Sequence, residues 1–163
     1  MALVKIRPVT LGGKPAKLYE NLIPVGASRG DNTNAARACN QLVQFLLRRF
    51  FERRPDLLPP LPGRTGFPID GKVGGQTVTG IHVFQDHFRK AGTPLFDDSR
   101  VSVPLGKFVP GTGNFRTMHA LNAFARVVMG DAAFDSLFSN REINREAPEL
   151  TGELVAEELL LNP

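Results

Sequence analysis

The chain has no tryptophan, one tyrosine and one cysteine among its 163 residues. A single cysteine, Cys39, cannot form a disulfide within the chain. It falls on the apolar face of a predicted helix, so we expect a buried structural thiol rather than a nucleophile. The pI is about 9.6, but few aromatic residues are interleaved with the basic ones, which makes a nucleic-acid partner an unfavoured interpretation.

Long apolar runs are missing as well. No stretch approaches the ~20 apolar residues of a membrane span. The N-terminus has no run of about seven apolar residues, which a secretory signal needs. We therefore expect synthesis in the cytoplasm without a signal peptide. Export would then require a non-classical route, such as a type VI or contractile injection machine, or incorporation into a phage particle.

Motifs for catalysis are also scarce. No Gly-x-Ser-x-Gly elbow is present, and Gly106–Gly113 lacks the Gly-Lys-Ser/Thr ending of a phosphate-binding loop. His82 and His87 are five residues apart, so a zinc site would have to recruit His119 and a carboxylate. Only eight acidic residues precede position 131, too few to favour a glycosidase pair. We expect no enzyme activity, no metal and no cofactor.

The charge that is present is unevenly distributed. The net charge is +4, but residues 131–163 contain two basic and eight acidic residues and so carry about −6. The remainder carries about +10, with Arg48, Arg49, Arg53 and Arg54 grouped near the end of a predicted helix. We interpret that group as complementing the helix dipole, with contacts to the phosphates or carboxylates of a partner as the alternative. A basic body and an acidic tail could pair within one chain or between neighbours.

One stretch, Ile69–Gln85, organises the rest. Asp70-Gly71 predicts a tight turn, because glycine accepts positive φ without a Cβ clash. The glycines that follow allow a second bend, and a helix is predicted from Thr77 to Ala91-Gly92. Its apolar stripe recurs at helical spacing in Val78, Ile81, Phe84 and Phe88.

This stretch resembles the signature of the peptidoglycan-binding-like domain, a small helical bundle of cell-wall hydrolases. The matching positions are Asp70-Gly71, Gly74, Thr77 and Phe84-Gln85. The segment Gly30–Leu47 resembles the first helix of the same family, with an inner stripe of Ala36, Cys39, Val43, Leu46 and Phe50. Two positions depart from the pattern: Gly75 replaces the usual proline, and Gly80 stands where a small or apolar residue is usual.

The resemblance covers about Gly26 to Asn122 and implies a mainly α, peptidoglycan-binding-like bundle with long loops. It also implies non-catalytic binding of wall peptide or glycan. Helix N-termini present unpaired N–H groups that suit the carboxylates of stem peptides. The candidate ligand-binding residues lie at two glycine-rich helix starts, which we expect to face one groove: Lys72, Gly74, Gly75, Gln76, Thr77, Arg116 and Thr117.

The second helix start is predicted as an echo of the first. Gly106–Thr117 repeats a Gly-Lys-hydrophobic, glycine-rich, then threonine order, and is followed by a helix with Met118 and Leu121 on one face. Between the two helices, a short strand is expected around Val101-Ser102-Val103.

The two ends of the chain lie outside the resemblance. We divide the chain into an arm (1–27), a peptidoglycan-binding-like domain (28–130) and an acidic helical tail (131–163). Leu3–Leu11 is predicted as a short strand or extended arm that covers the chain's own core or a neighbouring subunit. The tail is predicted to dock within the chain or, as we slightly favour, on another protein. A second interpretation follows: a structural or adaptor subunit of an injection apparatus or phage tail that uses the fold as a scaffold. A homo-oligomer is one arrangement that this interpretation allows.

Overall fold

The computed structural model of the chain describes residues 3–22, 24–26, 36–60, 66–93, 95, 97–103 and 116–163. Within those ranges it has six α-helices and two small two-stranded sheets, and helix makes up 58% of the described residues. The expectation of a mainly helical chain is therefore confirmed.

The elements follow one another in a simple order. The first part of the chain contains β1 (Val4–Leu11), β2 (Lys14–Asn21), β3 (Val25–Gly26), α1 (Arg37–Arg53) and the 3-10 turn η2 (Pro55–Leu57). The middle contains α2 (Gly75–Lys90), β4 (Arg100–Val101) and α3 (Thr117–Met129). The last part contains α4 (Asp131–Phe134), the turn η3 (Leu137–Ser139), α5 (Arg141–Glu146) and α6 (Pro148–Leu161).

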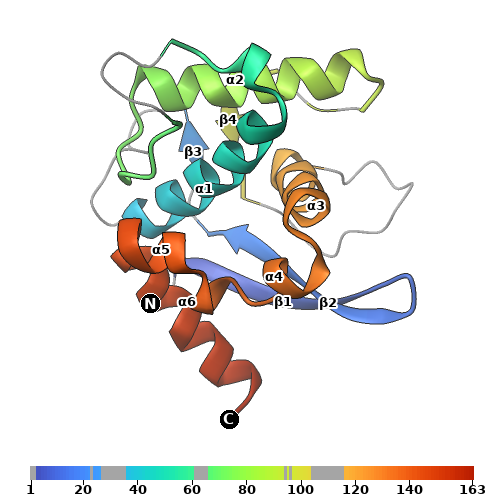
Figure 1. Cartoon of the computed structure of the whole chain (residues 1–163), viewed down its shortest axis with the longest axis vertical. Helices are drawn as coiled ribbons and strands as arrows, with labels where there is room; N and C mark the ends of the chain where they lie inside the picture. The colour runs from blue at the N-terminus through green and yellow to red at the C-terminus, as the bar shows by residue number, and fades with distance from the viewer. Residues whose placement is uncertain are drawn as a thin grey trace.

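Helix α1 lies at the centre of the molecule, with α2 on one side and the β1–β2 hairpin on the other (Figure 1). The predicted stripe from Ala36 to Phe50 is buried, as expected. The buried surface is wider than that stripe, because 12 of the 17 residues of α1 are buried, including Asn40, Gln41 and Gln44. Polar side chains on a helix that is covered on most sides must find partners inside the protein.

Helix α2 follows its predicted stripe closely. Ile81 and Phe84 are fully buried, and Val78 and Phe88 pack against the core. The helix ends at Lys90, and Gly92 follows with φ of +94°, as the glycine stop predicts. Gly80 has a packing reason, because a Cβ there would lie 2.6 Å from the Phe67 ring.

The predicted strand near the N-terminus is confirmed, and it belongs to a hairpin. β1 pairs antiparallel with β2 from Val4↔Asn21 to Leu11↔Lys14, and Gly12 and Gly13 take positive φ at the turn. The hairpin covers the chain's own core, since Val4 and Tyr19 are fully buried within it.

Side chains occupy both outer edges of this hairpin. On β1, the backbone N–H of Val4 donates to Glu153 and that of Ile6 donates to Glu157. Every second residue of β1 faces this edge, and the next one is Pro8, which has no N–H to satisfy. On β2, the side-chain amide of Asn122 makes two hydrogen bonds to the backbone of Tyr19, both at 2.8 Å: it accepts from the Tyr19 N–H and donates to the Tyr19 carbonyl. Edge groups that would otherwise pair with another strand are thus largely satisfied within the chain.

The acidic tail docks on its own chain. In α6, Leu150 and Leu154 are fully buried, and the glutamates meet the N-terminal half of the protein. Glu153 accepts from Leu3 and Val4, and Glu158 pairs with Lys17 at 2.6 Å. Hairpin amides and a lysine of the same chain thus hold these carboxylates, as the intramolecular alternative predicts. Docking on another protein, which we slightly favoured, stays a prediction.

Pro148 begins α6, because the first turn of a helix does not need the N–H that proline lacks. The predicted helical tail contains three α-helices, α4, α5 and α6.

One hydrophobic core joins the arm, the domain and the tail that we predicted. Its buried members include Val4 from the first segment, Leu42 and Phe84 from the second, and Leu154 from the third. The division into three segments stays a prediction. Among the described residues, the helices are all too short or too polar to cross a bilayer.

Candidate functional site

The first corner is the turn Asp70–Lys72 together with the start of α2. Gly71 has φ of +75°, and the Asp70 carboxylate accepts from the Lys72 N–H at 2.9 Å, so the predicted tight turn is confirmed. The buried amide of Gln44 holds this corner from α1. Its oxygen accepts from the Gly71 N–H, and its nitrogen donates to Asp70 Oδ1, to the Lys72 carbonyl and to Thr77 Oγ1.

The second corner is the turn Asp98–Arg100 together with the start of α3. In this corner, Gln85 of α2 makes the hydrogen bonds that Gln44 makes in the first corner. Its oxygen accepts from the Ser99 N–H, and its nitrogen donates to Asp98 Oδ1, to the Arg100 carbonyl and to Thr117 Oγ1. Asp98 accepts from the Arg100 N–H at 3.0 Å, just as Asp70 accepts from Lys72.

The hydrogen-bond pattern of the first corner is thus repeated in the second corner, but the repeated turn lies at another position than we predicted. We placed the echo of the first turn at Gly106, and residues 104–115 lie outside the described part of the chain. The counterpart of Asp70-Gly71-Lys72 is Asp98-Ser99-Arg100, with Ser99 at φ of +57°. Sequence reasoning missed it because serine rather than glycine occupies the positive-φ position. The signal that could have found it is the glutamine shared by Val43-Gln44 and Phe84-Gln85.

Some of the predicted ligand-binding residues are buried in the structure, and others are exposed. Thr77 and Thr117 are buried, at 1% and 7% exposure, and their hydroxyls accept from the two glutamines. They therefore hold the corners together. Lys72, Gly74 and Gly75 are exposed, and Gln76 is half-buried. Gly74 is the N-cap residue of α2, and none of the described side chains caps this end of the helix.

The two helix starts do not meet in one place. Thr77 bonds to Gln44, whereas Thr117 bonds to Gln85. Gln85 lies eight residues beyond Thr77 on the same helix, which is about 12 Å along the axis. Thr117, and Arg116 before it, therefore lie toward the other end of α2 from Lys72.

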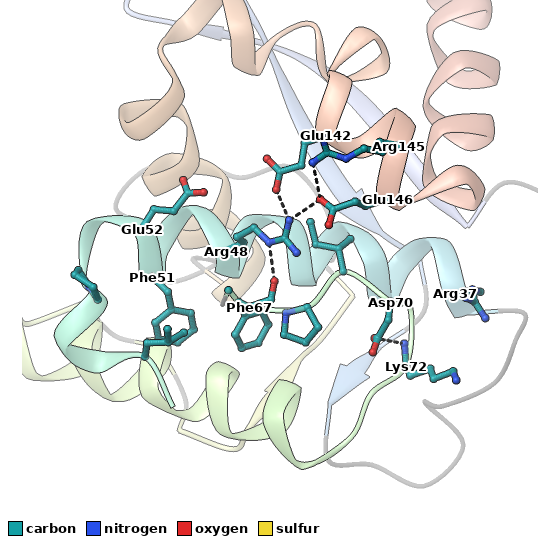
Figure 2. Close-up of a pocket in the computed structure, with 15 residues that line it drawn as sticks. Arg37, Arg48, Phe51, Glu52, Phe67, Asp70, Lys72, Glu142, Arg145 and Glu146 are labelled. Atoms are coloured by element: carbon teal, nitrogen blue, oxygen red, sulfur yellow. Dashed lines mark hydrogen bonds and ion pairs between the residues drawn. The ribbon is translucent and has the colours of Figure 1, made fainter. Parts of the chain in front are cut away.

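A pocket of about 1040 Å³ opens beside the first corner. It runs along the side of α1, between the segment 66–72 and helix α5 (Figure 2). Of the predicted residues, only Lys72 lines it. The lining was otherwise not foreseen, and its charged members are Arg37, Arg48, Glu52, Asp70, Lys72, Glu142, Arg145 and Glu146.

Arg48 lies in the middle of the pocket wall. Its guanidinium donates to the Phe67 carbonyl at 2.6 Å, to Glu142 and to Glu146. Arg49 donates to both oxygens of Glu142. Although burial opposes it, the hydrogen bonds and charges of Arg48 and Arg49 hold the pKa of Glu142 below its usual value. These two arginines thus bind tail carboxylates of the same chain, beyond the dipole role that we favoured.

Arg37 and Lys72 form one end of the pocket, which we call the cationic end. The stem of Arg37 lies against Gly71, where a Cβ would come within 2.4 Å of Arg37 Cγ. Arg37 pairs with Glu149 at 3.0 Å. The Lys72 ammonium has no ion-pair partner among the described residues.

The three histidines lie in separate surroundings. His82 pairs with Asp97 at 2.6 Å, and His87 meets Arg54 and the Phe50 ring. His119 accepts from the Arg116 N–H at the start of α3. Cys39 is buried, as expected. Within the described residues, no three His, Cys, Asp or Glu side chains gather as a metal site would require.

Comparisons with protein-family models, with curated proteins and with solved structures return no match. The functional interpretation therefore depends on the residues and the geometry above.

Proposed function

We propose that this protein is a non-catalytic peptidoglycan-binding module and that the pocket beside the first corner receives a stem peptide of the wall. The observation that carries the proposal is the cationic end of the pocket. There the Lys72 ammonium, without an ion-pair partner among the described residues, adjoins a helix start that no described side chain caps. A ligand carboxylate in this position would meet the positive charge of Lys72, two residues before the N-cap of α2 at Gly74.

The duplicated corner shows what the residues of the resembling motif do in this structure. The resembling motif contains aspartate, glycine, threonine and glutamine, and the structure gives each of these residues a defined role in one hydrogen-bond pattern. Gln44 organises Asp70, Gly71 and Thr77, and Gln85 organises the equivalent groups of the second corner.

The state of the pocket carboxylates favours binding without cleavage. A glycosidase acid needs a raised pKa so that it holds a proton at neutral pH. The pKa of Glu142 is instead lowered by its arginine partners. Asp70 is engaged in its turn, where Oδ1 accepts from the Lys72 N–H and from Gln44.

Co-sedimentation with purified sacculi tests the proposal. We expect the wild-type chain to be retained at low salt and released as salt rises, because exposed charges are screened within ~10 Å at 0.1 M salt. Lys72→Ala should weaken retention about threefold, the size expected for one exposed ion pair. Lys14→Ala, an exposed lysine at the hairpin turn, is the matched control and should bind as wild type does.

Arg116→Ala tests whether one groove or two is used. We predicted that Arg116 would act together with Lys72, but Arg116 lies at the start of α3 and does not line the pocket. In the present proposal its loss leaves retention unchanged. Failure of the wild-type chain to bind sacculi at low salt would reject the proposal.

The adaptor function remains the second candidate, and the end of α6 favours it. Leu159 and Leu160 are 65% and 75% exposed, although they belong to a helix whose earlier leucines are buried. This part of α6 projects away from the body of the molecule (Figure 1). Exposed apolar groups in one place often mark a protein contact. In this case Leu159→Ser with Leu160→Ser would abolish self-association or partner capture while leaving the melting temperature unchanged.

A further inference from the structure

The pocket has a second charged end, opposite Lys72. Figure 2 shows Glu52 and Phe51 at one end, Arg37 and Lys72 at the other, and Arg48 with Phe67 between them. Arg37 and Glu52 are both on α1, fifteen residues apart, which is about 22 Å along the helix axis. An extended peptide of about six residues spans that length.

Glu52 retains capacity for a positively charged ligand. Its side chain is 48% exposed, and its carboxylate pairs with Arg49 at 2.8 Å. That arginine also binds both oxygens of Glu142, while Arg48 serves Glu142 and Glu146. Three carboxylates therefore share two close arginines. Arg145 is a further cation among the described residues that line the pocket; it is 3.7 Å from Glu146 and 77% exposed, so solvent screens its contribution.

Part of the wall between the two charged ends is apolar, beside Arg48 and the α5 carboxylates Glu142 and Glu146, which also line the pocket. Phe51 and Phe67 are buried, with their rings stacked at 5.2 Å, and Leu58 and Ile69 also line this part. A ligand that fits has a carboxylate at one end, an aliphatic or peptide middle, and an amine at the other end.

We infer that the pocket recognises a short peptide bearing both a carboxylate and a free amine, with the carboxylate at Lys72 and the amine at Glu52. This inference rests on the proposed function and makes it more specific, since it names the chemical group of the wall peptide that the pocket recognises. A free side-chain amine on a stem peptide that is not cross-linked has this chemistry, and acylation of that amine removes its charge.

Chemical acetylation of the wall separates this inference from simple charge attraction. Sacculi treated with acetic anhydride lose free amines and become more negative, while the chain carries +4. General attraction would therefore strengthen retention on acetylated sacculi. Recognition of the amine by Glu52 would weaken it, by about threefold for one partly exposed charge pair.

The variants follow from the same logic. Glu52→Gln should bind native sacculi as weakly as the wild type binds acetylated sacculi, and it should show no further loss on acetylation. Asp56→Asn is the matched control, because Asp56 is a neighbouring carboxylate, 60% exposed, that does not line the pocket. It should keep the wild-type response. Melting temperatures of both variants should stay at the wild-type value, which separates lost binding from lost folding.

Each alternative outcome has one meaning. Wild-type retention that is unchanged or stronger on acetylated sacculi overturns the inference and leaves wall binding standing. A Glu52→Gln chain that still loses retention on acetylation places the amine elsewhere and also overturns it. No retention of the wild type on native sacculi rejects the proposed function itself, and the inference with it.

Discussion

The first corner, Asp70–Thr77, and the second corner, Asp98–Thr117, use the same set of hydrogen bonds but different supports. In the first corner, the threonine follows the aspartate by seven residues. A second side-chain amide, that of Asn40, supports this corner by donating to the Gly71 carbonyl at 2.9 Å. The second corner runs nineteen residues and is held by the β3–β4 pairing, in which Val25 lies opposite Val101.

The difference shows which parts of the corner are essential to its geometry. Glutamine, aspartate and threonine occur in both corners and make equivalent bonds. The residue at positive φ changes from Gly71 to Ser99, and the distance to the helix changes as well. Side-chain hydrogen bonds therefore define the corner, while glycine only makes its backbone easier to form.

The pocket lies beside the first corner only. Ile69, Asp70 and Lys72 line it, whereas no residue of the second turn does. Helix α5 supplies the opposite wall there, through Glu142 and Glu146. We conclude that the two corners share a structural pattern while one of them adjoins the candidate binding site.

The largest expected effect comes from removing either glutamine. Gln44→Leu leaves the buried Gly71 N–H without its acceptor, and Gln85→Leu does the same to the part-buried Ser99 N–H. In each variant a threonine hydroxyl also loses the amide that donates to it. We expect a loss of about 3 kcal/mol in the free energy of unfolding for each variant, measured by urea denaturation. Gln76→Leu, at a half-buried position outside both networks, should change it by less than about 0.5 kcal/mol. A loss below about 1 kcal/mol for Gln85 alone would break the equivalence of the corners.

Gly71→Val comes next in size. Its φ of +75° is unfavourable for a β-branched residue, and the new Cβ would overlap Arg37, so we expect a loss of about 2 kcal/mol. Gly74→Ala is the control, since nothing lies within 4 Å of its Cβ position and its φ is negative. Equal melting temperatures for these two variants would contradict the tight turn.

Ser99→Gly should act in the opposite direction. Relief of the positive φ at Ser99 should stabilise the chain by up to ~1 kcal/mol, less than the Gly71 effect, because glycine also costs more entropy on folding. Thermal melting measures the change. If Ser99→Gly were as destabilising as Gly71→Val, the serine side chain would have a role that the first corner lacks.

The smallest effect is a pH dependence specific to the second corner. Burial lowers the pKa of His119 below its ordinary value of 6.5, and Nδ1 accepts the Arg116 N–H, which requires that nitrogen to be unprotonated. The unfolded chain then binds a proton more readily than the folded chain, so stability falls as pH drops below about 6.5.

The measurement compares melting temperatures at pH 8 and pH 5.5. His119→Gln should reduce the decrease between those values, because glutamine can accept a hydrogen bond at either pH. An identical decrease in wild type and variant would show that other groups cause the acid sensitivity.

Much of this architecture could be read from local patterns. The stripes of α1 and α2, the turn at Asp70-Gly71 and the stop at Gly92 depend on neighbours within a few residues, and all four are confirmed. The second turn was not predicted from the sequence because Ser99, rather than a glycine, occupies its positive-φ position. The pocket was not predicted because its walls come from α1, the segment 66–72 and α5, which lie far apart in the sequence.

The sequence by itself determined the helical character, the turn chemistry and the unequal charge of the two ends, because spacing, positive φ and charge are properties of short segments. Only the tertiary structure decided where those charges go. Four glutamates of α6 became partners for the hairpin and α1, at Leu3, Val4, Ile6, Lys17 and Arg37. Such pairing depends on burial of Leu150 and Leu154 against the core, a long-range contact whose partners no local pattern identifies.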